Sequence, residues 1–404
     1  MLRGRRNRQT TARWTEWCAA AYEGNRREDA LTLLARLRAA RDAGPPYERA
    51  AALAALGRAP APLLLLLDRH ARQPGASPAP ARGRQRDPLR LLLASLDPDG
   101  RVREAAVEGL AARPGPLAAA ALALRTVDRV HPVRVKAAAA LLARRAPDEA
   151  AVAVGVLLRL TGRSRAGGLL ASYRAVLGAP PYRRTVRALA AADDPATRRF
   201  GVQLALDLGV YAPGDLLRAA LCDRDQVCRR LCAERLLELD PGQAAGLLRA
   251  RGAGIRELAV SALPRDVPAT RLVGPLADRA RMVRAQARWK LYERAEPPAE
   301  VYRRQIRKGR AVPPRLLAGL AVGLGECGDA ADTALLARLL RDPCTEVRRA
   351  AARAVGRLAR PEELAALLGP LAGDPDRGVA REVIEALSRA RGPRDYVQSG
   401  HRPR

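Results

Sequence analysis

The residues best suited to chemistry gather in one basic stretch, residues 279–315. It holds twelve Arg or Lys side chains against three acids, Glu293, Glu296 and Glu300. Guanidinium and ammonium groups at this density bind phosphate and carboxylate oxygens, and Arg does so with two parallel hydrogen bonds. Helical spacing collects several of these cations on shared faces. The expected partner-binding residues are Arg281, Arg284, Arg288, Lys290, Arg303, Arg304, Arg307, Lys308 and Arg310.

Aromatic residues interleave with these cations and offer a second kind of contact. Trp289 and Tyr302 have the character of platforms on which nucleic-acid bases stack, although anchoring in a helical core is the more common role of such residues. The cations themselves have two readings, phosphate contact or a solvated helix face that binds nothing.

Catalytic motifs are missing from the sequence. It contains no Walker A loop, no HExxH and no GxSxG nucleophile elbow. Its three histidines, His70, His131 and His401, are scattered, which leaves little material for a Ser/His/Asp or Cys/His triad. We therefore expect no catalytic residue and no cofactor.

Three cysteines lie close together in the sequence. Cys228 and Cys232 stand four residues apart on one helix face and Cys222 precedes them, but there is no CxxC pair and no nearby His. A metal site would need such ligands, so we interpret these cysteines as small apolar core residues.

The elements that position the basic stretch belong to a repeat. The segment LLRDPCTEVRRAAARAVGRLA at 339–359 recurs in variant form at steps of about thirty residues, which indicates a helical solenoid. In each copy an Asp-containing break separates two helices. The second helices open at Val102, Val133, Thr197, Val227, Ile255, Val283, Val347 and Val379.

Two gaps of 64 residues in this series predict degenerate units that open near Arg165 and Pro314, and an atypical unit opens near Tyr47. The consensus L-x-x-L-x-D-x-x-x-x-V-R-x-x-A-x-x-A-L resembles HEAT repeats, especially the short units first noted in phycobilin lyases. The resemblance covers about residues 30–390. It implies an all-α, right-handed α-solenoid, or superhelix, of about eleven helical hairpins.

Two recurring polar positions have a structural role. The Asp before each break (Asp97, Asp223, Asp342, Asp374) is expected to cap the second helix. The Arg after the opening hydrophobe is expected to pair with that Asp or with one in the next repeat. This Arg occurs at Arg103, Arg134, Arg256, Arg284 and Arg348.

Breaks in the phase predict the domain organisation. Residues 1–13 are expected to form a basic disordered arm and residues 14–72 irregular N-terminal helical hairpins. Residues 73–88 form a Pro/Arg-rich loop, 89–391 the regular repeat array, and 392–404 a polar tail.

Composition narrows the partner. A formal net charge of +30 attracts polyanions, so we expect either an acidic protein surface or a nucleic-acid phosphate backbone. The longest uncharged run has 11 residues, far short of the ~20 that span a bilayer, so we expect no membrane contact. We also expect a monomer located in the cytoplasm.

The expected function is a non-catalytic interaction scaffold that binds its acidic partner through this basic surface. The alternative is a DNA-binding repair enzyme that resembles HEAT-like alkylpurine glycosylases. In that case Trp289, Tyr292 and Tyr302 would supply the aromatic contacts, and Glu293 and Glu296 the carboxylate. A resemblance to the phycobilin lyases themselves implies a pigment site, for which the sequence shows no identifiable residues.

Overall fold

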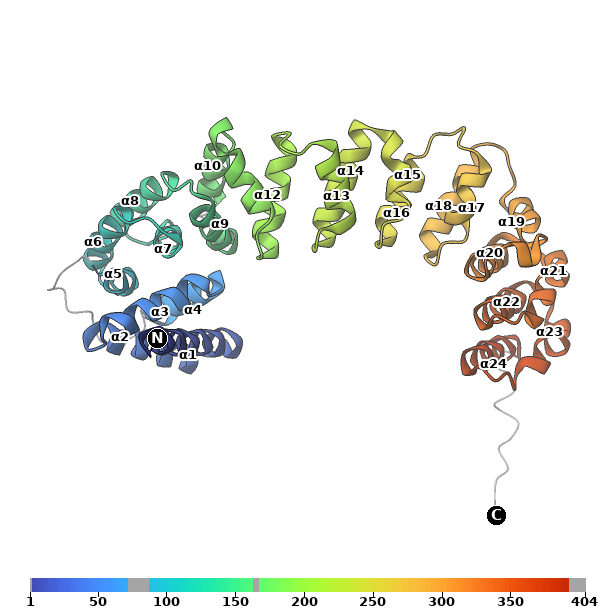
Figure 1. The fold of residues 1–404 in the computed structure, drawn as a ribbon, viewed down its shortest axis with the longest axis horizontal. Coiled ribbons are helices and arrows are strands. Elements are labelled where there is room, and N and C mark those ends of the chain that lie inside the picture. Colours follow the sequence, from blue (N-terminus) through green and yellow to red (C-terminus); the bar gives the residue numbers. More distant parts are fainter. Residues whose placement is uncertain (1, 72–86, 163–166, 392–404) are drawn as a thin grey trace, which may run out of the picture. The chain divides into compact units, whose positions relative to one another are not determined.

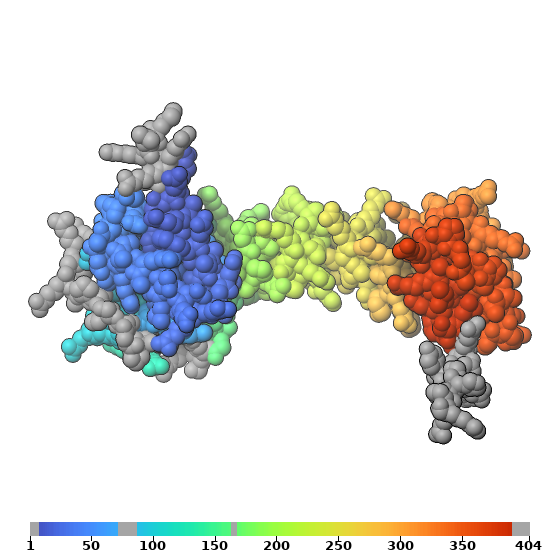
Figure 2. Space-filling view, turned by 90° about the horizontal axis from the view of Figure 1, so that it is seen from below, coloured from blue at the N-terminus to red at the C-terminus, as the bar shows by residue number. Residues whose placement is uncertain are grey.

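The computed structural model describes residues 2–71, 87–162 and 167–391, and every regular element in these residues is helical. The helices form two compact units, Met1–Ala212 and Pro213–Arg404. Figure 1 traces the elements, and Figure 2 shows one face as a filled surface, with α1–α4 in blue and α20–α24 in orange and red.

The first unit is built from α1 to α12. Their bounds are Leu2–Gly24, Arg27–Asp42, Pro46–Arg58, Ala61–Ala71, Pro88–Ala94, Gly100–Ala111, Pro116–Arg125, His131–Leu142, Pro147–Leu160, Gly167–Leu177, Arg183–Ala190 and Pro195–Asp207. A short 3₁₀ helix, Pro180–Tyr182, precedes α11.

The second unit contains α13 to α24. Their bounds are Pro213–Cys222, Gln226–Leu239, Ala244–Leu247, Ala253–Ala262, Ala269–Leu276, Arg281–Tyr292, Pro298–Ile306, Pro314–Cys327, Thr333–Ala337, Thr345–Leu358, Pro361–Leu368 and Arg377–Arg391. Five 3₁₀ helices extend its turns: Pro241–Gln243, Gly309–Ala311, Ala330–Asp332, Arg338–Arg341 and Gly369–Leu371.

The helix starts confirm the repeat spacing, although in α14 the buried position belongs to Cys228 and the predicted Val227 is 43% exposed. All eleven expected openings lie within two residues of a helix start or inside its first turn, including the degenerate units, where α10 begins at Gly167 and α20 at Pro314. Within the second unit, α20 packs beside α22 and α22 beside α24, while α19, α21 and α23 each pack on the helix that follows (Figure 1). The predicted stacking of helical hairpins is therefore present.

Residues 2–13 differ from the expected disordered arm, because they form the first half of α1. The helix continues through Trp14, Cys18 and Ala21, which lie on one face and are buried, and the Trp14 and Trp17 rings meet edge to face. A helix anchored on this apolar face extends toward its N-terminus because each added residue forms one more backbone hydrogen bond once the first turns exist.

The N-terminal helices are joined to the regular repeats by a buried ionic network. α3 and α4 both pack against α7, and α4 also packs against α9. Arg125 of α7 is fully buried. It pairs with Asp68 of α4 and lies 3.1 Å from Asp128, which Arg103 also binds at 2.7 Å. Residues 73–86 of the expected loop at 73–88 lie outside the described residues, and so does the whole of the expected tail at 392–404.

Candidate functional site

The basic stretch occupies α18, α19, the Gly309–Ala311 turn and the start of α20. Ion pairs engage five of the nine expected binding residues. Arg303 is held by Asp332 at 2.6 Å and Glu300 at 2.5 Å, and Arg304 lies 3.1 Å from Glu296. The other three, which also pair with glutamates, are Arg284, Arg288 and Lys290. These pairs leave fewer free cations than the sequence indicates.

Glu326 of α20 is the centre of the largest of these clusters. Arg284 donates two hydrogen bonds to its carboxylate, one of them 3.1 Å long, and Arg288 donates a third at 2.8 Å. Burial raises the pKa of Glu326, but the hydrogen bonds from the two arginines outweigh burial and hold that pKa below its usual range. Arg284 and Arg288 thus join α18 to α20 rather than face a partner.

Lys290 is also unsuited to binding a partner. Its side chain is buried, and its Nζ lies 3.2 Å from Glu293. Four of the expected residues remain exposed with no described carboxylate within 4.0 Å. They are Arg281, Arg307, Lys308 and Arg310.

The aromatic residues divide in the same way. Trp289 and Tyr292 of α18 are 59% and 58% exposed, and Met282, also exposed, lies on the same helix face. Tyr302 is fully buried, and its hydroxyl donates a hydrogen bond of 2.9 Å to the Leu276 carbonyl. A stacking role for Tyr302 is therefore wrong, because its ring is part of the core.

The carboxylates of the glycosylase alternative are both engaged. Glu293 pairs with Lys290, and Glu296 accepts a hydrogen bond from Arg304 at 3.1 Å. In the described structure neither is left unpaired beside the exposed Trp289.

In six of the described repeats the repeated Arg stabilises the turn between the two helices. It donates to a backbone carbonyl of its own inter-helix turn, six residues earlier. The six such bonds run from Arg103 to Asp97, Arg134 to Asp128, Arg229 to Asp223, Arg256 to Ala250, Arg284 to Asp278 and Arg348 to Asp342, at 2.6–3.0 Å.

Three of these arginines also cross to an Asp of the next repeat, as expected, whereas Arg134 donates to carbonyls of its own turn and Arg284 pairs with Glu326. Arg103 binds Asp128 with two hydrogen bonds, Arg256 binds Asp278, and Arg348 binds Asp374. We call this series of Arg–Asp contacts between successive turns the ladder. Its bidentate geometry fixes each hairpin against its neighbour.

The helix caps differ from the expectation by two residues. Asp97, Asp223, Asp342 and Asp374 each accept a hydrogen bond from the backbone N–H two residues on, inside the turn. The N-cap of α6 is Asp99 and that of α14 is Asp225. The predicted caps are wrong because a short Asp side chain stabilises its own turn as readily as a helix end.

The ladder is interrupted at α20. Buried positions of α22 recur in α20 thirty residues earlier, so Leu317 matches Val347 and Ala318 takes the place of the ladder Arg. As a result, no Arg of α20 binds Asp342. The turn before α20 contains no Asp, and Arg284 pairs with Glu326 instead.

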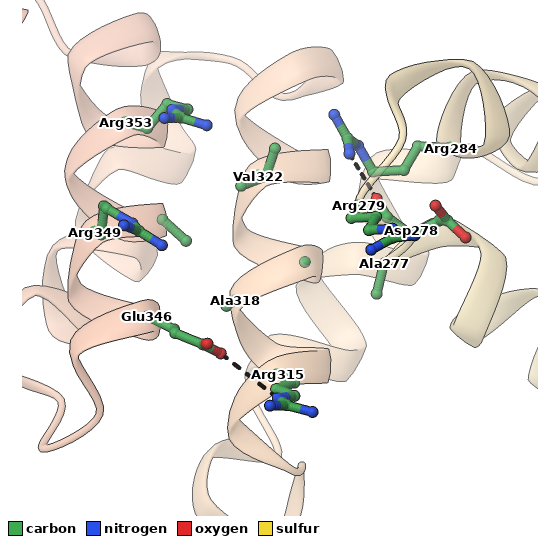
Figure 3. A pocket seen from close by; sticks show the side chains of 12 residues that line it. Ala277, Asp278, Arg279, Arg284, Arg315, Ala318, Val322, Glu346, Arg349 and Arg353 are labelled. Atoms are coloured by element: carbon green, nitrogen blue, oxygen red, sulfur yellow. Dashed lines mark hydrogen bonds and ion pairs between the residues drawn. The ribbon is translucent and has the colours of Figure 1, made fainter. Parts of the chain in front are cut away.

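A pocket of about 280 Å³ opens at this interruption, between the turn before α18, α20 and α22 (Figure 3). Gly319 of α20 lies against the Ala277 carbonyl so closely that any side chain there would overlap it. Arginines dominate the lining, which includes Arg279, Arg284, Arg315, Arg349 and Arg353 with Asp278 and Glu346.

The sequence did not point to the α22 part of this pocket. Arg349 and Arg353 lie in the most regular repeat, so their sequence context indicates ordinary repeat residues and not candidate binding residues. The signal that marks them is a contrast between neighbouring repeats, because α20 carries Gly319 and Gly323 at the positions that match Arg349 and Arg353. The two glycines themselves are covered by Ala277 and Tyr302, so the space in front of Arg349 lies beside Ala318 and Val322 of α20.

Cys228 and Cys232 are fully buried in α14, as expected of core residues, and burial raises the pKa of Cys232 to about 12, but the core interpretation is wrong for Cys222, which is exposed. Across the ranges that the structure describes, no group of three or more His, Cys, Asp or Glu is arranged to hold a metal ion. In the same residues no single helix has the length and apolarity to cross a membrane, although α3 and α4, bent by 115°, meet both criteria as a pair.

Comparisons with known proteins give a limited set of matches. Residues 315–397 match the family model for HEAT repeats. No curated protein matches the sequence. Among solved structures, the crystal structure of an engineered protein from the Northeast Structural Genomics Consortium aligns over 88% of this chain and 98% of its own, at 16% identity and a TM-score of 0.25.

Proposed function

We propose that this chain, whose repeats are HEAT repeats, is a non-catalytic interaction scaffold that binds an acidic partner. The observation that carries the proposal is the exposed cluster at the end of α19 and in the following turn, formed by Arg307, Lys308 and Arg310. None of these three cations has a described carboxylate within 4.0 Å, although the charge of Arg307 contributes to the lowered pKa of Asp332, so most of their charge is available to a partner. We call them the basic turn.

An acidic protein is the partner that the neighbouring surface favours. Met282, Trp289 and Tyr292 form an exposed apolar stripe on α18, with Arg281 at the start of the same helix. Trp, Tyr and Arg are the residues that most often dominate the binding energy of protein interfaces. Nucleic acid is the second candidate, because Trp289 also has the exposure needed for base stacking.

The basic turn is tested by a triple reversal, Arg307→Glu, Lys308→Glu and Arg310→Glu. The variant should melt like the parent, because none of the three side chains forms an ion pair in the described structure. It should bind heparin more weakly, and the salt slope should fall by about one unit for each of these cations that binds an anionic group of heparin in the parent. Salt-dependent affinity chromatography and a thermal melt measure the two effects.

A matched control removes the same charge elsewhere in the second unit. Arg338, Arg341 and Arg360 are also exposed, with no described carboxylate within 4.0 Å. Their triple reversal to Glu should leave heparin affinity close to that of the parent. Equal reductions of heparin affinity in the two triple variants would show that only net charge matters and would contradict the proposal for the basic turn.

The two partner classes separate in a pull-down with and without nuclease. An acidic protein should remain bound after nuclease at a fixed stoichiometry, and Trp289→Ala should release it. A nucleic acid should disappear with nuclease and show a steep dependence of affinity on salt.

A further inference from the structure

The pocket at α20 lies where the chain departs from its own repeat. In α16, α18 and α22 an Arg follows the opening hydrophobe, and this Arg (Arg256, Arg284 or Arg348) donates to a backbone carbonyl of its own turn. In α20 Ala318 stands in place of that Arg, and a pocket opens beside it. Local departures from a regular pattern are expected at functional sites, because regular packing alone would favour the consensus residue.

We propose that this pocket binds the dianionic phosphate of a phosphomonoester. The proposal goes beyond the scaffold function, and its residues are not those of the basic turn. Three arginines from three elements supply donors that the protein leaves available: Arg279 before α18, Arg315 at the start of α20 and Arg349 on α22 (Figure 3).

The available donors follow from the contacts of these three side chains. Arg279 makes only one long hydrogen bond, 3.3 Å to the Arg251 carbonyl. Arg315 is 92% exposed, and its Nε lies 4.0 Å from Glu346, at the limit of an ion pair. Arg349 is exposed, with no described carboxylate within 4.0 Å. Each of them therefore has guanidinium N–H groups free to bind an anion.

Two further arginines form fixed walls. Arg284 is held by Glu326, and Arg353 donates to Glu382 at 2.9 and 2.5 Å. Because Glu326 and Glu382 lie outside the lining, they orient these arginines without occupying the space between them. Fixed cations beside free ones make a site that a small anion enters with little rearrangement.

The chemistry of the lining selects among anions. Three guanidinium groups of the lining, those of Arg279, Arg315 and Arg349, have no described carboxylate closer than 4.0 Å, and a dianion offsets their mutual repulsion better than a single carboxylate. A nucleic-acid backbone carries one charge per phosphate and follows an extended surface, whereas this pocket has about 280 Å³, slightly below the ~300–1,000 Å³ of typical small-ligand sites. A terminal phosphate fits both conditions.

The first experiment titrates the full chain with phenyl phosphate and with phenyl sulfate, which has the same shape but one charge. Phenyl phosphate should bind more tightly by calorimetry at about pH 7.5. At about pH 5.0 its affinity should fall about tenfold, because the second phosphate pKa is near 6 and the dianion becomes scarce. Asp and Glu side chains usually titrate near pH 4 and Arg above 12, so the ligand is the group that changes charge.

The second experiment removes single donors. Arg349→Ala and Arg315→Ala should each weaken phenyl phosphate binding at least about tenfold, the effect of removing one hydrogen bond between charged groups. Arg360→Ala removes the same charge from an exposed side chain outside the pocket and should bind like the parent. The basic-turn triple variant should also keep phenyl phosphate binding, so the two proposals fail separately.

The source of the phosphate is resolved by competition. A phosphoserine peptide that displaces phenyl phosphate better than inorganic phosphate does would assign the site to a phosphorylated protein. Equal displacement would assign it to a small phosphorylated ligand, and both results support a phosphomonoester site. The proposal is overturned if phenyl sulfate binds as tightly as phenyl phosphate, if Arg360→Ala weakens binding as much as Arg349→Ala, or if short duplex DNA displaces the ligand.

Discussion

At the scale of single residues, buried ion pairs determine which charges the chain keeps for itself. Asp128 is the clearest case, because it binds both Arg103 and Arg125 in the interior of the first unit. Burial raises the pKa of Asp128, but hydrogen bonds from Arg103 and the Val130 N–H and the charge of Arg125 lower it further, so it stays below its usual range. This carboxylate therefore remains ionised at neutral pH and neutralises two buried cations.

Replacement of this carboxylate gives the first prediction. Asp128→Ala leaves Arg103 and Arg125 buried without that partner, and we expect the free energy of unfolding to fall by about 3–5 kcal/mol. Asp374→Ala is the matched control, because it removes the partner of a more exposed arginine. The Arg348 side chain is 16% exposed, whereas those of Arg103 and Arg125 are 5% and 1% exposed. Urea denaturation of both variants should show the larger decrease for Asp128→Ala, and an equal decrease would contradict the role of burial.

Local residue types could not reveal which cations of the basic stretch are free. Arg284 and Arg288 looked like binding residues, yet their partner Glu326 lies 42 and 38 residues further along the chain. Arg307 and Lys308 have the same composition around them and remain exposed. The difference arises from tertiary packing, which charge spacing along one helix does not encode.

At the scale of elements, the packing of α19 on α20 depends on the absence of a side chain. Gly323 of α20 lies directly under the Tyr302 ring, which a Cβ at this position would overlap. Tyr302 is fully buried and bonded to the Leu276 carbonyl, so it has little freedom to move away. Close helix contact of this kind requires Gly even though Gly lowers helix propensity.

The second prediction follows from this contact. Gly323→Ala should lower the free energy of unfolding by about 1–3 kcal/mol, as overpacking of a core does. Gly254→Ala in α16, where a Cβ meets no atom within 4 Å, should be neutral or raise it by up to about 1 kcal/mol. In thermal melts the melting temperature should fall for Gly323→Ala and should rise or stay unchanged for Gly254→Ala. A Gly323→Ala protein as stable as the parent would contradict this packing.

Element positions were the most predictable feature of the chain. The spacing of Val283, Val347 and their equivalents placed all the second helices, including α20, where no Val-Arg pair marks the start. Periodicity succeeds because every repeat must bury the same face. It fails at α1, where Trp14 and Cys18 extend a helix into the expected arm, and at the pocket, which exists because Ala318 departs from the period.

At the scale of the whole molecule, the distribution of acids explains the available charge. The chain has 42 acidic and 72 basic residues, and both units place acids in ladder contacts or caps. An acid held between repeats is not available to neutralise the surface. The basic turn and the Arg-lined pocket are thus consistent with one underlying feature, the use of carboxylates for internal structure.

The dependence of both units on ionised carboxylates gives the third prediction, a loss of stability in acid. Asp128, Asp278, Glu326 and Asp374 all have lowered pKa values, and Asp194, where hydrogen bonds from Arg159 and Thr197 outweigh burial, is lowered to about 2. A carboxylate whose pKa is lower in the folded than in the unfolded chain contributes stability above its unfolded pKa of about 4 and loses it as pH falls through the folded value.

Urea midpoints should therefore stay nearly level from pH 7 to about 5 and then fall continuously toward about pH 2. Protonation also raises the net positive charge, and the resulting repulsion lowers stability in the same pH range. Added salt separates the two causes, because about 0.5 M salt screens repulsion between exposed charges but affects buried pairs much less. We expect salt to restore only part of the stability. Full recovery would assign the acid sensitivity to surface repulsion, whereas a midpoint that is constant down to pH 3 would show that the ladder carboxylates contribute nothing to folding.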